Sequence, residues 1–177
     1  MDKAPIILLH ELSLRSRDKA HSLPQQIEVK ATWEGVGFRL DGSAWVVPLD
    51  QVKEILTKVS ISHIPGAKDW VRGVANVRGN LLPILDLKGF LVGKMTKMSR
   101  QSRILVMQHK GVVAGLLVEE VMGMRHFLEE EYSKDTADLD VSFSQMLTGQ
   151  YRQRGESWGV FNINHLAELP EFMQVAA

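Results

Sequence analysis

The sequence contains no cysteine, which excludes disulfide bonds, thiolate metal sites and a cysteine nucleophile. It also lacks any apolar run that approaches the roughly 20 residues of a membrane-spanning helix. Neither charge sign is in excess, because 21 lysine and arginine residues balance 21 aspartate and glutamate residues. Without a net charge, general attraction to nucleic acid or to an anionic membrane is not expected.

A secretory signal peptide is not apparent at the N-terminus. The apolar stretch at residues 6–9 is too short for the core of such a peptide, and His10 and Glu11 follow it directly. The composition, with 45% hydrophobic and 24% charged residues, is typical of a globular protein with a sizeable core. We therefore expect a soluble, cytoplasmic protein.

Motifs of enzymes and of metal sites are missing as well. There is no G-x-S-x-G nucleophile turn and no Walker loop. Asp138 and Asp140 lack the glycine and the distal glutamate of a calcium loop. The sequence thus predicts no catalytic residue, no metal and no cofactor, while an enzyme assembled from distant segments stays open as an alternative. No two histidines have the spacing of local zinc ligands, the six being His10, His21, His63, His109, His126 and His165.

The first residues differ in pattern from the rest. Residues 5–19 repeat apolar side chains near one stripe, which predicts an amphipathic helix. Pro24 ends any helix that precedes it. We expect residues 1–26 to form a helical arm and linker before a domain at residues 27–177. The arm either packs on that domain or carries an additional contact.

Short strands and glycine turns dominate the domain. Asp41-Gly42 stands between two apolar runs, which is typical of a tight hairpin whose turn needs positive φ at both positions. We expect Pro48 to end the second strand of this hairpin and Asp50 to cap a helical turn at residues 51–53. Residues 54–62 are expected to form a further strand.

The middle of the chain predicts a second hairpin and a capped helix. We expect residues 69–72 to form a helical turn that ends at Gly73. Two apolar runs then flank Arg78-Gly79-Asn80, which predicts a hairpin with a glycine in its turn. Asp86 is expected to cap a short helix that Gly93 closes.

The C-terminal half also consists of short apolar runs separated by polar or glycine-containing segments. Residues 94–102 are polar and basic, and we expect them to form an exposed connector. A third hairpin is expected from residues 103–109 and 112–121. Residues 158–163 are expected to form the last strand, and Asn164 to cap a short helix after it.

Two parts of the chain echo each other. When Gly42 is placed on Gly111, Ile55 falls on Met124. This spacing indicates either an internal duplication or the rhythm that any two hairpins share. Many short strands with glycine turns predict a mainly β fold built from barrels, with a few short helices.

Residues 70–87 resemble the signature of the CheW family of coupling proteins. The sequence there is W-V-R-G-V-A-N-V-R-G-N-L-L-P-I-L-D-L, and the family pattern is G-V-x-N-x-R-G followed by P-x-x-D-L. Residues 38–55, 103–124, 147–149 and 161–163 are similar to further segments of the family. The resemblance covers about residues 33–169.

The resemblance implies a fold and a function. The fold is CheW-like, with two five-stranded SH3-like β-barrel lobes that share a core. The function is that of a non-catalytic adaptor between a methyl-accepting chemoreceptor and a CheA-type histidine kinase. Its expected partners are the cytoplasmic tip of the receptor and the regulatory domain of the kinase. No nucleic acid, no insertion into the membrane and no cofactor are implied.

Within the family, four segments and the N-terminal helical arm resemble the adaptors of twitching-motility systems, which control type IV pili. The segments are Gly37-Phe38-Arg39, residues 73–78, residues 89–91 and residues 123–127. A flagellar chemotaxis adaptor stays the alternative. A small β-barrel enzyme is a more distant alternative, and a barrel that binds nucleic acid is disfavoured by the zero net charge.

The resemblance also assigns a candidate receptor site. Val52, Glu54, Gly73 and Arg78 match positions where the family binds its receptor. Val52 would offer an apolar anchor, Gly73 would let a helix approach closely, and Glu54 would pair with Arg78 across the barrel. From the residues alone, the alternatives are a core position for Val52, a helix end at Gly73 and an exposed turn at Arg78.

Two further residues of the signature are expected to be structural. Pro83 should lie at a strand edge, because proline cannot donate a hydrogen bond to a neighbouring strand. Asp86 should serve as a helix cap, because its carboxylate can accept from a free backbone N–H.

Overall fold

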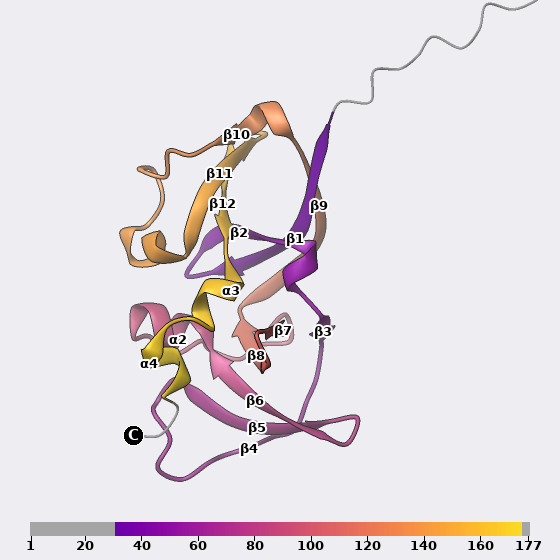
Figure 1. Ribbon diagram of the computed structural model, residues 1–177, viewed down its shortest axis with the longest axis vertical. Helices are drawn as coiled ribbons and strands as arrows, with labels where there is room; N and C mark the ends of the chain where they lie inside the picture. The colour runs from indigo at the N-terminus through magenta and orange to yellow at the C-terminus, as the bar shows by residue number, and fades with distance from the viewer. Residues whose placement is uncertain (1–30, 175–177) are drawn as a thin grey trace, which may run out of the picture. The chain divides into compact units, whose positions relative to one another are not determined.

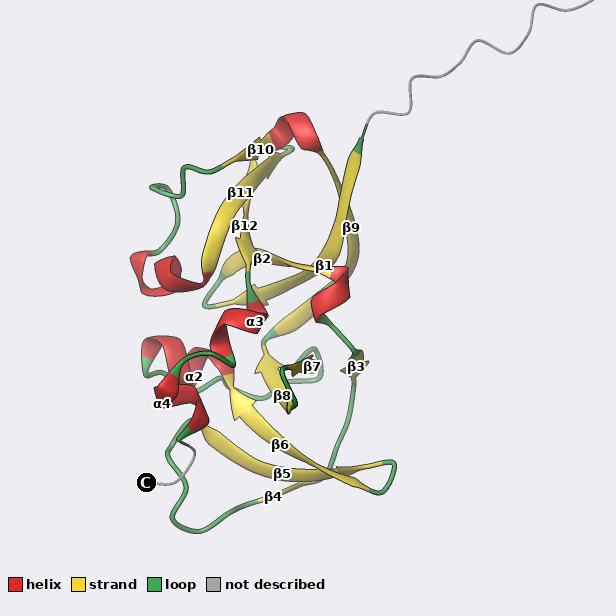
Figure 2. Cartoon of the chain, viewed as in Figure 1, coloured by secondary structure: helices red, strands yellow, loops and turns green. Residues whose placement is uncertain are grey.

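The structure is a computed structural model that describes residues 31–174. Strands in this range form two six-stranded sheets, labelled in Figure 1 and drawn in yellow in Figure 2. The first sheet has the order β10-β11-β12-β2-β1-β9, and the second sheet has the order β3-β7-β8-β6-β5-β4. The strands are β1 (Thr32–Leu40), β2 (Ser43–Pro48), β3 (Glu54–Leu56), β4 (Ile61–Ser62), β5 (Val71–Val77), β6 (Asn80–Asp86), β7 (Arg103–His109), β8 (Val112–Val118), β9 (Glu120–Leu128), β10 (Tyr132–Ser133), β11 (Leu147–Gln153) and β12 (Glu156–Phe161).

The mainly β, two-lobed fold that the sequence predicts is confirmed. Each sheet has six strands rather than five. The additional strand is a two-residue edge strand in both cases: β4 pairs with β5, and β10 pairs with β11. Such short edge strands leave few unpaired backbone groups, which limits pairing with another chain.

The strand order shows an internal duplication. Strands β1–β6 and strands β7–β12 occupy equivalent places in the two sheets, with β2 parallel to β12 in one and β8 parallel to β6 in the other. In each half, the first two strands join one sheet and the last four join the other. The echo between Gly42 and Gly111 is therefore a true repeat, since both glycines close equivalent hairpins.

Two-residue turns close the predicted hairpins. Both residues of each turn have positive φ, for example 53° at Arg78 and 86° at Gly79. Asp41-Gly42 and Lys110-Gly111 follow the same pattern. A fourth turn of this kind, at Arg154-Gly155, joins β11 to β12 and was not predicted. Its Arg-Gly pair lies between polar residues, so the apolar flanks that mark a hairpin in sequence are weak there.

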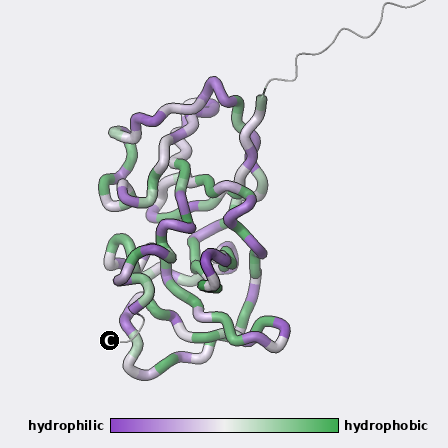
Figure 3. The backbone as a smooth tube through the Cα atoms, viewed as in Figure 1, coloured by the Kyte–Doolittle hydropathy of each residue, from purple (hydrophilic) through white to green (hydrophobic). Residues whose placement is uncertain are grey.

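One hydrophobic core joins the two sheets, as expected. It includes Phe38 and Trp45 from the first sheet and Leu85 and Leu116 from the second, each at most 2% exposed. Two smaller clusters line the opposite faces, because successive side chains of a strand point to opposite sides. Figure 3 shows the hydrophobic stretches along the strands.

Short helices follow the strands, and their caps only partly match the prediction. Asp86 caps α2 (Leu87–Val92) and Gly93 ends it with φ 73°, as predicted. The prediction for Asp50 is wrong, because this residue lies inside the 3₁₀ turn η1 (Leu49–Gln51) and caps nothing. Asn164 is not a cap either, since it lies inside α3 (Ile163–Leu166). The remaining helical segments are η2 (Glu129–Glu131), η3 (Val141–Met146) and α4 (Pro170–Met173).

Some predicted elements are replaced by others. Residues 69–72 do not form a helical turn: β5 begins at Val71, and a bulge lies between Val71 and Gly73. The run at residues 54–62 is broken into β3 and β4. The strand predicted at residues 112–121 ends at Val118, where the chain crosses to the first sheet as β9.

The helical arm predicted for residues 1–26 lies outside the described residues. Within residues 31–174, no helix has the length and apolarity needed to cross a membrane.

Candidate functional site

Arg78 and Glu54 meet as predicted. Arg78 lies in the β5–β6 turn, and its Nη2 is 2.5 Å from Oε1 of Glu54 at the start of β3. The Asn76 side chain accepts the N–H of Gly79 at 2.9 Å, which orders the turn that carries Arg78. The guanidinium remains 78% exposed and the carboxylate 28% exposed, so the pair is available to a partner.

A shallow groove of about 170 Å³ runs beside this ion pair, and we call it the Arg78 groove. Its floor is apolar and its rim carries both charge signs. This arrangement suits an amphipathic helix that lays an apolar face into a groove and places polar groups at its rim. The lining includes Lys53, Glu54, Val77, Arg78, Leu82 and Val113.

Val52 lies two residues before Glu54 but does not line the Arg78 groove. It directly follows η1 and is half-buried against the core that joins the sheets. Part of its side chain therefore serves packing. Its contribution to a receptor contact stays a prediction.

Gly73 lies at the other end of β5 from the Arg78 turn. At about 3.3 Å per residue, the two positions are about 17 Å apart along the strand. The residue has φ +134°, and a Cβ placed on it would lie 2.1 Å from the carbonyl oxygen of Ser62. The close approach that Gly73 permits within the chain is thus that of β4, and its contact with a receptor stays a prediction.

Asp86 is fully buried and accepts four hydrogen bonds. One comes from the N–H of Gly89 at 2.9 Å, which caps α2 as predicted. The N–H and the hydroxyl of Thr96 each donate at 2.8 Å, and Nε of Arg72 donates at 3.0 Å. Arg72 also donates to the carbonyl of Thr96. The structural role of Asp86 therefore extends beyond a cap, because it anchors the connector at residues 94–102.

The connector at residues 94–102 is not exposed throughout, whereas the sequence predicts an exposed connector. Most of residues 94–102 are exposed, but Thr96 is 1% exposed and Ser102 is 5% exposed. Sequence reasoning missed the roles of Arg72 and Thr96. A threonine ten residues after an aspartate carries no local pattern that would indicate the contact.

Pro83 does not lie on an edge strand. It belongs to β6, which has β5 on one side and β8 on the other. Pairing with β8 begins only at Ile84, so the missing N–H of Pro83 falls just outside that ladder. The physical reason for the prediction holds, but the position is the end of a ladder within the sheet.

An ionic cluster that the sequence did not indicate joins elements of both sheets. Nζ of Lys88 on α2 lies 2.8 Å from Oδ1 of Asp41 and 2.9 Å from Oε1 of Glu119. The hydrogen bonds to Asp41 and Glu119 raise the pKa of Lys88 above its usual value. Asp41 lies in the β1–β2 turn and Glu119 lies where the chain crosses from β8 to β9. The cluster thus ties the crossover to both lobes.

Residues 31–174 contain no cluster of three or more histidine, aspartate or glutamate side chains placed to hold a metal ion. At Arg78 the structure places one ion pair beside a groove with apolar lining residues.

Comparisons with known proteins agree with this description. Residues 34–171 match the model of the CheW-like domain. Protein PilI of Pseudomonas aeruginosa is 40% identical over 174 residues, which cover 98% of this chain and 97% of PilI. Chemotaxis protein CheW of Thermotoga maritima is 25% identical, with coverage of 77% of this chain and 88% of the relative.

A solved structure shows the same fold. The scaffolding protein TtCheW from Thermoanaerobacter tengcongensis superposes with a TM-score of 0.68 and 23% sequence identity. The match covers 79% of this chain and 95% of TtCheW. With the family model matching most of the chain, these findings show that the chain belongs to the CheW family.

Proposed function

We propose that this chain is a non-catalytic scaffold that couples a methyl-accepting chemoreceptor to a CheA-type histidine kinase. Membership of the CheW family supports this role. TtCheW, which has the same fold, is a scaffolding protein. The receptor would bind through its cytoplasmic tip and the kinase through its regulatory domain.

The single observation that carries the receptor side of the proposal is the Arg78–Glu54 pair beside the Arg78 groove. A helical receptor tip would place apolar side chains over Leu82 and Val113 and a carboxylate near Arg78. Binding that differs between two receptor states would shift the population of the complex, and this shift would reach the kinase.

We further propose that the pathway is the one that controls type IV pili. The support is the likeness to PilI, which extends over nearly the whole of both chains. The segments around Phe38, Phe90 and Met124 resemble the same subfamily. A flagellar pathway is the alternative.

Binding to the kinase tests the adaptor role and the pathway together. Calorimetry would compare the regulatory domain of the pilus kinase with that of the flagellar kinase, both from the organism of this chain. Selective binding to the pilus kinase is expected. Selective binding to the flagellar kinase would keep the adaptor role and reject the pathway, and binding to neither folded domain would contradict the adaptor role.

Charge reversal tests the receptor site. Arg78→Glu should place two carboxylates together and weaken receptor binding by at least about tenfold, which corresponds to about 1.4 kcal/mol. Arg154→Glu is the matched control, because Arg154 is an exposed arginine in the equivalent turn of the first sheet. Equal loss in both variants, or no loss in either, would reject the Arg78 groove as the receptor site.

A further inference from the structure

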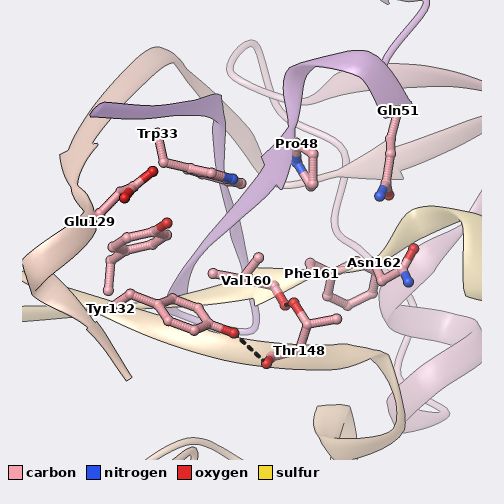
Figure 4. A pocket seen from close by; sticks show the side chains of 10 residues that line it. Trp33, Pro48, Gln51, Glu129, Tyr132, Thr148, Val160, Phe161 and Asn162 are labelled. Carbon is pink, nitrogen blue, oxygen red and sulfur yellow. Dashed lines mark hydrogen bonds between the residues drawn. The ribbon is translucent and has the colours of Figure 1, made fainter. Parts of the chain in front are cut away.

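A second cavity, of about 520 Å³, opens on the first sheet. Its wall is formed by the start of β1, by η2, by β10 to β12 and by η1, so it is separate from the Arg78 groove on the second sheet. We call it the Trp33 groove, and Figure 4 shows the side chains around it. Its polar and aromatic lining residues include Trp33, Gln51, Glu129, Tyr132, Tyr151 and Asn162.

Three aromatic rings form a row along one side of this groove. The ring centroids of Trp33 and Tyr151 are 5.1 Å apart, and those of Tyr151 and Tyr132 are 5.2 Å apart. Tyr151 is 4% exposed and forms the base, whereas Tyr132 is 37% exposed and forms an edge. The hydroxyl of Tyr132 donates to the carbonyl oxygen of Thr148 at 2.7 Å, which fixes the ring (Figure 4).

Several polar groups around the groove have no hydrogen-bond partner among residues 31–174. The indole N–H of Trp33 makes no hydrogen bond among residues 31–174. Oε1 of Gln51 accepts the N–H of Ile163 at 2.9 Å, which leaves the amide NH₂ of Gln51 unused. Oδ1 of Asn162 is buried without a partner. Figure 4 shows Gln51 and Asn162 at one end of the groove and Trp33 at the other.

Negative charge stands at the Trp33 end. Glu129 begins η2, lies near Trp33 in Figure 4, and forms no ion pair among the described residues. Burial raises the pKa of the Tyr151 phenol, and the neighbouring Tyr132 and Glu129 raise it further. A cationic group at this end would therefore meet an unpaired carboxylate.

We propose that the Trp33 groove binds a proline-rich segment of a partner protein that carries an arginine or lysine beside its prolines. A polyproline II segment has no internal hydrogen bonds, so its carbonyl oxygens need donors such as Trp33 Nε1 and Gln51 Nε2. One turn of a polyproline II helix, three residues, spans about 9 Å. This length is close to the sum of the two ring separations, 5.1 Å and 5.2 Å, along the aromatic row. The basic residue pairs with Glu129.

The shape of the aromatic row favours this occupant over a quaternary ammonium group. A cage for such a cation needs ring faces that surround one point. Here the Trp33 and Tyr151 planes differ by 31° and the Tyr151 and Tyr132 planes by 55°, and the rings follow one another in a row. The row can instead present Trp33 and Tyr132 to prolines one turn apart, with the buried Tyr151 ring between them.

The equivalent cavity of the second sheet shows that the fold does not require these rings. A cavity of about 360 Å³ lies there, with Ser102 in the place of Trp33. Lys58 is the counterpart of Glu129, because each lies three residues before the equivalent strand, β4 or β10. The cavity of the second sheet therefore carries a positive charge where the Trp33 groove carries a negative charge. The aromatic row and the carboxylate are thus a property of one groove, which is typical of a site that recognises a partner.

The test follows the Trp33 indole N–H in a ¹⁵N NMR titration of the full chain, with the resonance assigned through Trp33→Phe. The probe is the peptide Arg-Ala-Leu-Pro-Pro-Leu-Pro, and the matched peptides replace its prolines with alanine or its arginine with glutamate. The indole resonance should shift saturably with the probe. Each matched peptide should bind at least about tenfold more weakly.

Variants then test the contacts. Tyr132→Ala should lower the affinity by about tenfold. Tyr132→Phe should lower it clearly less than Tyr132→Ala, because the ring stays although its hydrogen bond to Thr148 is lost. Glu129→Gln should lower the affinity for the probe but should not lower the affinity for the peptide with glutamate in place of arginine. Arg78→Glu should leave the affinity for the probe unchanged.

Several outcomes would overturn the proposal. These are the absence of a shift at millimolar peptide, equal binding of the alanine peptide, or a shift of the Trp33 resonance with choline and not with the peptide. The last result would assign the groove to a small cation instead.

Discussion

Asp86 and Asn162 occupy equivalent positions, each at the N-cap of the short helix that follows the last strand of a repeat. Their backbone N–H groups donate to equivalent carbonyls, of Trp70 at 2.7 Å and of Met146 at 2.8 Å. The Asp86 side chain accepts four hydrogen bonds, whereas Oδ1 of Asn162 accepts none and Gln51 caps α3 instead. Both repeats therefore share the strand–helix junction. Only the Asp86 side chain, in the second sheet, also anchors a connector.

The hairpin turns of the two sheets differ in the same manner. Arg78 and Arg154 have φ 53° and 54° in equivalent turns. Arg78 pairs with Glu54, but Arg154 forms no ion pair within residues 31–174. The first sheet has no carboxylate at the position of Glu54. Glu54 pairs with Val106 in the second sheet, and at the equivalent place in the first sheet Gly123 pairs with Gly37. The shared geometry belongs to the fold, and the ion pair belongs to one surface.

Asp86→Ala should give the largest loss of stability. It would leave Nε of Arg72 and the N–H of Thr96 without their acceptor in a buried site, at a cost of about 3–5 kcal/mol. Asn162→Ala should cost less than about 1 kcal/mol, because it removes an oxygen that has no partner. Urea denaturation of both variants measures the difference. Equal losses would mean that the Asp86 network contributes nothing beyond the junction itself.

Gly73→Ala should give the next largest loss. The new methyl group would meet the backbone of Ser62, and φ +134° is strained for alanine, so the cost should be about 2–4 kcal/mol. Gly149 holds the equivalent bulge, but a methyl group there would meet the ring of Tyr132, which is partly exposed.

Gly149→Ala should therefore cost clearly less than Gly73→Ala in the same denaturation experiment, since a side chain can move where a backbone cannot. Gly149→Ala combined with Tyr132→Ala should recover part of that smaller loss. A larger loss at Gly149 than at Gly73 would show that the Tyr132 ring is held as firmly as the β4 backbone.

These contrasts also show what the sequence can predict. The Arg78-Gly79 turn and the cap at Asp86 follow from local patterns, because each depends on neighbours along the chain. The duplication was only one of two readings of the sequence, and the strand order decides in its favour. The prediction of a helical turn before Gly73 failed because a bulge and a helix end both use glycine with positive φ. The Trp33 groove could not be predicted, since its residues lie on strands and helical turns far apart in sequence.

Lys88→Met should lower the stability by about 1 kcal/mol at neutral pH, because the two carboxylates of Asp41 and Glu119 lose their partner. The pKa of Lys88 is raised in the folded state. The stabilisation is thus fully present below the usual value of 10.5 and is lost as the pH rises through the raised folded value.

Thermal denaturation of the wild type and of Lys88→Met at pH 8 and above pH 11 measures this effect. The difference between the two proteins should shrink at the higher pH. A difference that stays constant would mean that Lys88 acts through the packing of its aliphatic stem rather than through its charge.

The smallest effect on stability should come from the two turn arginines. Arg78 is 78% exposed in its pair with Glu54, and pairs at the surface contribute less than about 1 kcal/mol. Arg78→Ala and Arg154→Ala should therefore unfold at nearly the same urea concentration as the wild type, while only Arg78→Ala weakens receptor binding. A marked loss of stability in Arg78→Ala alone would make the ion pair a structural element of the second sheet. Comparable stability with a selective loss of binding would instead show that one of two equivalent turns has been specialised as a contact surface.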